Sequence, residues 1–206
     1  MTAYTDFTSD FPARCLELLD RASGVASVNG LEITLLLMTA SASLLVPFER
    51  LKPDTDHSSH PFGDNRRFGA AAEKLAELMK ESFVGSVLCP DTESSWRLAK
   101  NVKSVDGDLD CWLPDVLLKP LNKQRAVKST LTLVRNAFAH GSIYTIGDPI
   151  KELIFVKEVT VQHSDKTWKR IGFEVLSVSY GDFQRFIRAW VMFLGQPNVW
   201  ELRLAA

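Results

Sequence analysis

The chain has 206 residues, 46% of them hydrophobic and 24% charged, which is typical of one large folded domain or two small ones with a packed core. A formal net charge of −1 excludes global electrostatic capture of nucleic acid or membrane, so RNA binding would need a local basic patch. The three cysteines, Cys15, Cys89 and Cys111, lack regular spacing and favour reduced thiols over a disulfide framework.

The N-terminal segment, residues 1–14, lacks the basic region and apolar core of a signal peptide. The most apolar run, residues 33–46, is too short to span a bilayer comfortably and contains several hydroxyl side chains. We therefore expect a buried core helix, no membrane partner and a cytoplasmic location.

The first part of the chain predicts three helices. The first opens at Ser9 or Asp10 and stops at Ser23-Gly24, where glycine interrupts the pattern. The second covers about 31–51 and is apolar almost all round its first half, and Pro47 is expected to kink or end it. The third covers 68–84 and has one polar face that is expected to lie in solvent.

The segment 52–65 is a polar loop whose acidic and histidine side chains superficially resemble metal ligands. These side chains are Asp54, Asp56, His57 and His60. A metal site needs ligands held by rigid elements and supported by further contacts, and nothing in the loop supplies that rigidity. We interpret the loop as solvated and expect no metal or other cofactor.

The segment 96–103 interleaves apolar and basic residues and fits a short helix or an extended strand equally well. Trp96 with Arg97, Lys100 and Lys103 could stack a base and contact phosphates in RNA. An amphipathic segment with Trp96 in the core and the cations in water explains the same pattern, and the sequence does not decide between the two.

The fourth helix opens near Pro114 or Asp115, is continuous from about Leu121, and ends at Gly141. It is the most strongly amphipathic element of the chain. Its apolar stripe consists of Val127, Leu131, Val134 and Phe138.

After Gly141 the apolar pattern changes from helical to alternating. Residues 150–178 predict a β-hairpin, and the strand face with Ile171, Phe173 and Val175 is expected to pack on the helices. The pair Ser179 and Asp182 resembles a capping box. It opens a last helix that stops at Gly195, and residues 196–206 form a tail.

The end of the fourth helix gathers Arg135, Asn136 and His140 on one exposed edge. Arginine offers a planar fork to phosphate oxygens, and histidine, with an unperturbed pKa of about 6.5, exchanges protons near neutral pH. This set suits RNA, whose 2′-hydroxyl can attack the adjacent phosphate without a metal. The same residues are also good capping chemistry, which the residues alone favour over catalysis. A two-fold dimer would bring two histidines and two arginines together.

The string Leu133-Val134-Arg135-Asn136-Ala137-Phe138-Ala139-His140-Gly141 resembles the signature of the HEPN superfamily (higher eukaryote and prokaryote nucleotide-binding domains). That signature is an arginine and a histidine with four to six residues between them, often with a polar residue directly after the arginine. Arg135 and His140 match the pair, and Asn136 matches the polar position. The resemblance implies a helical bundle that dimerises through the motif. For many members it also implies metal-independent endoribonuclease activity in toxin–antitoxin, defence or stress systems.

The sequence therefore predicts a mainly α fold: a single HEPN-like domain over 1–206, with about five helices and a β-hairpin inserted before the last one. The leading functional hypothesis is a homodimeric endoribonuclease that cuts RNA, with an antitoxin or another protein as a further partner. His140 would be the acid or base, Arg135 the phosphate clamp and Asn136 the orienting group. The alternative is a non-catalytic module that binds a nucleotide or a partner protein through the same edge.

Overall fold

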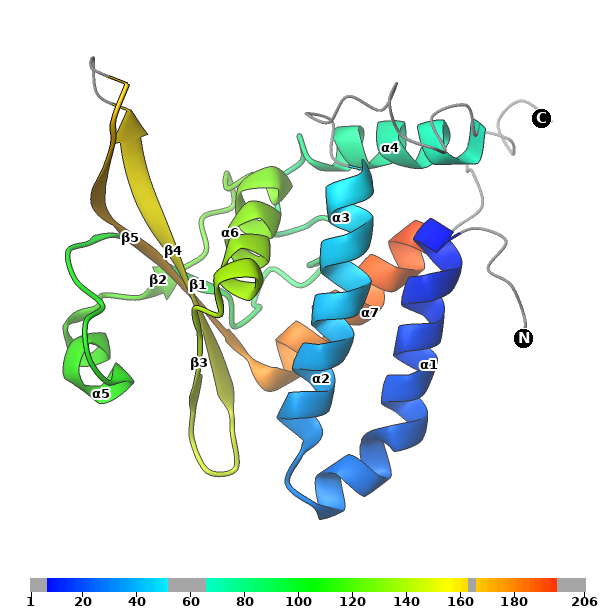
Figure 1. Cartoon of the computed structure of the whole chain (residues 1–206), viewed down its shortest axis with the longest axis horizontal. Helices are drawn as coiled ribbons and strands as arrows, with labels where there is room; N and C mark the ends of the chain where they lie inside the picture. Colours follow the sequence, from blue (N-terminus) through cyan, green and yellow to red (C-terminus); the bar gives the residue numbers. More distant parts are fainter. Residues whose placement is uncertain (1–6, 52–65, 163–165, 196–206) are drawn as a thin grey trace.

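The computed structural model describes residues 7–51, 66–162 and 166–195. A layer of helices covers one face of a five-stranded sheet, and a short helical segment lies on the other face (Figure 1). The helices are α1 (Phe7–Val28), α2 (Glu32–Ala40), α3 (Val46–Leu51), α4 (Arg66–Leu78), α5 (Leu109–Trp112), α6 (Val127–His140) and α7 (Tyr180–Gly195), with a π-helical turn η1 (Ser41–Leu45) and a 3₁₀ turn η3 (Leu113–Asp115). The strands are β1 (Arg97–Val102), β2 (Lys119–Pro120), β3 (Ile143–Ile146), β4 (Glu152–Gln162) and β5 (Trp168–Ser179).

The sheet is antiparallel throughout, in the order β2-β1-β5-β4-β3. The prediction of a mainly α bundle with one inserted hairpin is therefore wrong. The hairpin exists as β4 and β5, but it forms the centre of a larger sheet. Strands β1 and β3 are short, and the paired backbones of β5 and β4 hold them in place, so their own alternation is weak.

The two faces of the sheet have separate cores. Leu153, Phe155, Leu176 and Val178 point into the main core with the helices. Ile154, Val156, Phe173 and Val175 pack with Trp112 in a second, smaller core.

The prediction that Ile171, Phe173 and Val175 face the helices is wrong, because the side chain of Trp112 and its neighbours cover this face. Ile171 is exposed and lies where the register between β4 and β5 shifts.

The observed helix ends differ from the predicted ones where tertiary contacts outweigh the local sequence pattern. α1 continues through Gly24 and ends before Gly30, whose φ of 65° suits a left-handed stop. α4 ends at Leu78, earlier than predicted, and α6 begins only at Val127 because the preceding segment forms η3 and β2. The last helix begins and ends as predicted. The metal-like loop, residues 52–65, lies outside the described residues.

The second predicted helix is continuous from Glu32 to Leu51. Pro47 does not end it, but the helix is irregular just before this residue. Proline has no N–H for the carbonyl of Ser43, four residues earlier. The helix widens into the π turn η1 just before Pro47, and the Ser43 carbonyl instead accepts a 2.8 Å hydrogen bond from Trp190 Nε1 of α7. By length and composition this helix could cross a membrane, but Leu36, Leu44 and other side chains along it are buried in the main core.

The start of α7 is tied to the loop before β1 through a capping interaction. The Asp182 N–H donates to Ser179 Oγ at 3.2 Å, which confirms the predicted cap. The reciprocal acceptor is Ser95 Oγ, which accepts the N–H of Ser179 at 2.9 Å. The N–H and hydroxyl of Ser95 in turn donate to the Asp182 carboxylate. Burial alone would raise the pKa of Asp182, but these hydrogen bonds and the Arg185 guanidinium outweigh it and lower that pKa.

Replacing Trp190 by Phe should lower the free energy of unfolding by about 2–4 kcal/mol, because a buried carbonyl loses its donor and the smaller ring leaves space. Urea unfolding measures the loss. The same substitution in a Pro47→Ala background should cost less, since alanine at this position supplies the N–H that proline lacks. Equal costs in both backgrounds would contradict the role given to the indole.

Acidification should destabilise the fold partly through Asp182. Because the folded-state pKa of Asp182 is lowered, its ionised form adds stability above the unfolded-state pKa of about 3.9, and this stability is lost as pH falls further. Asp182→Asn should therefore lower stability at pH 7 and flatten its fall between about pH 5 and pH 2. Thermal unfolding over that range tests this, with exposed Asp110→Asn as the control.

Candidate functional site

Helix α6 is anchored in the main core and ends in a well-formed cap. Leu131 and Val134 have no exposed surface. Gly141 adopts φ 66° and ψ 21°, and the N–H of Ser142 donates to the Ala137 carbonyl at 2.9 Å. This geometry closes the last turn as glycine permits. The helix therefore presents its exit residues from a rigid support.

Arg135 is held by two neighbours. Its Nε donates to Glu49 Oε1 of α3, and its Nη1 donates to Asn136 Oδ1 at 2.8 Å. The side chains of Arg135 and Glu49 are 31% and 35% exposed, so the pair lies at the protein surface with one edge in solvent. Nη2 is the part of the guanidinium that remains for a ligand, since the bonds to described residues use Nε and Nη1.

His140 is exposed and forms no hydrogen bond or ion pair with any described residue. It follows Arg135 by five residues, which is about 7.5 Å along the axis and about 140° around it, with Asn136 between them. The structure thus joins Arg135 to Asn136 directly and leaves His140 apart from them at the helix end. Asn136 orients the arginine here, a different partner from the histidine or ribose expected from the sequence.

Sequence reasoning missed Glu49. It lies 86 residues before its partner, so no spacing rule connects them. One signal was present: between residues 33 and 51, Glu49 and Arg50 are the charged residues in an otherwise uncharged helix. A carboxylate at the end of such a helix is a candidate for pairing with a cation on a neighbouring element.

The segment proposed for RNA contact is extended, as strand β1, which settles the choice left open between helix and strand. Trp96 is buried, and its ring packs edge-on against Phe83 and Phe186 at 5.0 and 5.5 Å. The Trp96 ring is therefore closed to a nucleobase. Arg97, Lys100 and Lys103 are exposed along β1.

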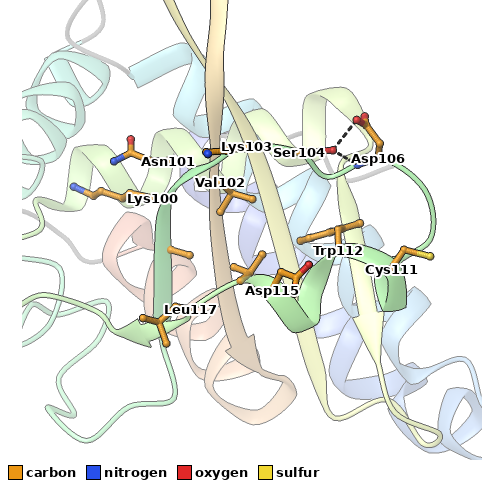
Figure 2. A pocket seen from close by; sticks show the side chains of 12 residues that line it. Lys100, Asn101, Val102, Lys103, Ser104, Asp106, Cys111, Trp112, Asp115 and Leu117 are labelled. Carbon is orange, nitrogen blue, oxygen red and sulfur yellow. Dashed lines mark hydrogen bonds between the residues drawn. The ribbon is translucent and has the colours of Figure 1, made fainter.

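A hollow of about 600 Å³ lies between β1 and the segment with α5 and η3 (Figure 2). Lys100 and Lys103 line it from the strand, while Trp112 and Asp115 line it from the opposite side. The backbone of Asn101 has a φ of 58°, which is uncommon for a residue other than glycine. The hollow carries both signs of charge, so its lining selects no single ligand charge.

The Arg135–Glu49 pair should contribute little to folding. Because both side chains are about a third exposed, Glu49→Ala should change the free energy of unfolding by about 0–1 kcal/mol. The matched contrast is Glu174→Ala, because the side chains of Glu174 and its partner Arg125 are only 16% and 6% exposed. This substitution leaves a buried guanidinium without its carboxylate and should lower the free energy of unfolding by about 3–5 kcal/mol. Chemical unfolding measures both, and a large loss at Glu49 would make the pair a structural one.

A family model described as HEPN pEK499 p136 matches residues 1–196. No curated protein and no solved structure matches the chain. The family match spans the described elements from α1 to α7, and it includes α3 and the exit of α6. The chain belongs to the HEPN pEK499 p136 family, within the HEPN superfamily.

Proposed function

We propose that the protein is a metal-independent endoribonuclease whose site is the exit of α6. HEPN-family domains are often ribonucleases. The observation that carries the proposal is an arginine oriented by Glu49 and Asn136 on the same rigid helix end as the exposed His140, which pairs with no described residue. A fixed cation and an accessible imidazole are the two groups that phosphodiester transfer requires.

In the proposed reaction, the 2′-hydroxyl of RNA attacks the adjacent phosphorus and the bond to the 5′-oxygen of the next nucleotide breaks. A histidine accepts the proton of the attacking hydroxyl, and an acid returns a proton to the leaving oxygen, giving a cyclic phosphate and a free 5′-hydroxyl. Arg135 stabilises the charge on the phosphate oxygens through Nη2. Glu49 is a positioning residue, because it fixes the guanidinium without contacting the RNA.

The proposal includes a homodimer. Base and acid are two roles, and each α6 exit offers one imidazole, that of His140. A two-fold axis beside the exits would place two histidines and two arginines in one cleft. A toxin–antitoxin, defence or stress setting, with a protein that neutralises the activity, belongs to the same proposal and follows from the family resemblance.

The second candidate is a non-catalytic nucleotide-binding or interaction module. The ion pair favours it, because Glu49 offsets the charge of Arg135 and so weakens its attraction for phosphate. Such a module would bind a ligand or partner at the α6 exit and leave RNA intact.

The test is cleavage of single-stranded RNA by the intact protein in EDTA. His140→Ala and Arg135→Ala should each lower the rate by about 100-fold or more, since they remove proton transfer and charge stabilisation. Arg21→Ala, which removes an exposed cation of α1, should leave the rate unchanged. Circular dichroism and thermal unfolding should show each variant folded.

Equal cleavage by the wild type and His140→Ala would refute the ribonuclease assignment. No cleavage, together with a mononucleotide that slows hydrogen exchange around Arg135, would support the binding module instead. Light scattering on the same samples gives the mass of the assembly, and a monomeric mass in an active enzyme would exclude the shared cleft.

A further inference from the structure

Two strand segments of this nearly neutral chain carry several cations and no carboxylate. Residues 97–103, of β1 and the position after it, contain three cations and no Asp or Glu. Residues 166–173, which include the first half of β5, contain three more and again no carboxylate. The six cations are Arg97, Lys100, Lys103, Lys166, Lys169 and Arg170.

The sheet joins these two segments. β1 and β5 are antiparallel, with Arg97 opposite Ser177 and Val102 opposite Phe173. The C-terminal end of β1 therefore lies beside Phe173, the last residue of the basic segment of β5. The strands approach closely there: a Cβ added to Gly172 would lie 3.0 Å from the Val102 carbonyl oxygen. The cations of β1 and those of the hairpin thus follow one another along the sheet.

The hairpin of β4 and β5 extends beyond the helices that cover the rest of the sheet (Figure 1). Trp168 lies on this extension, opposite Gln162, and is 67% exposed. Lys166 and Arg170, two residues before and two residues after it, are exposed as well, whereas Lys169 is the next residue of β5 and points to the opposite face of the strand. An uncovered indole between cations has no role in either core.

The cations form few ion pairs, although Lys100 and Lys103 share the hollow with Asp106 and Asp115. Arg170 pairs with Glu158 at 3.3 Å, but both side chains are more than half exposed, so solvent weakens the attraction. The other five form no ion pair with a described residue. The strip also differs from the α6 exit, where Glu49 already occupies the Nε of Arg135.

We propose that this basic strip, defined by Trp168 and the cations other than Lys169, binds single-stranded RNA, with a base stacked on Trp168 and phosphates beside the lysines and arginines. Indole rings stack on any base, and ammonium groups contact successive phosphates without reading sequence. A protein partner is less well matched, because cations flank the exposed ring on both sides. The inference rests on the proposed function, for which it names the surface that grips the substrate.

The test measures binding apart from cleavage. Intact protein carrying His140→Ala is titrated into a labelled single-stranded RNA, and anisotropy gives the affinity. Adding Trp168→Ala should weaken binding about 10-fold, as expected for one lost stacked base. Trp168→Phe keeps an aromatic face and should retain most of the affinity. Leu18→Ala removes a side chain of α1 that is 63% exposed outside the strip and should change nothing.

Charge is tested by salt dependence. Replacing Lys166 and Arg170 together by Gln should reduce the slope of log affinity against log salt by about 1.4, or about 0.7 for each phosphate contact. Thermal unfolding of each variant provides the check on folding.

If Trp168→Ala binds single-stranded RNA with wild-type affinity, the proposed role of the strip is wrong. A change in assembly mass without a change in RNA affinity would also contradict it and would make the hairpin a protein interface. The two proposals fail separately. Cleavage that depends on His140, with binding indifferent to Trp168, would keep the nuclease and remove the strip. Binding that depends on Trp168, without cleavage, would keep the strip and remove the nuclease.

Discussion

The packing of α6 between the helices and β4 is the contact on which the rest of the structure depends. Three phenyl rings join its exit to the neighbouring elements: Phe155 of β4 lies 5.9 Å from Phe138 and 5.1 Å from Phe183 of α7. Phe138 lies between Arg135 and His140 in the chain, so the ring contact fixes the turn that carries both. The sheet and α7 are therefore part of the support of the site.

Elements with a strong repeat could be predicted from the sequence, and elements stabilised by their neighbours could not. Repeating apolar residues identified α6, α7, β4 and β5, because each of these buries its own apolar face. β1 and β3 have only short patterns and depend on backbone pairing with β5 and β4. The prediction of which sheet face packs on the helices was wrong for a similar reason. Trp112 covers Phe173 from a segment for which the sequence indicates only a turn.

The residues of the candidate site also fall into a predictable group and one that could not be predicted. Arg135, Asn136 and His140 lie within six residues of one helix, so their proximity follows from local geometry. Glu49 reaches Arg135 only through tertiary packing, because α3 and α6 are far apart in the chain.

The distribution of charge explains how a chain of net charge −1 could act on RNA. At the α6 exit, Glu49 fixes the arginine and offsets its charge, which favours orientation over long-range attraction. Attraction would then have to come from elsewhere, and the proposed basic strip on β1 and β5 would supply it. Separating the two tasks allows the reacting groups to be held firmly while the RNA is bound mainly through its backbone. A nearly neutral overall charge is therefore compatible with an RNA substrate, provided that the cations are gathered on one surface.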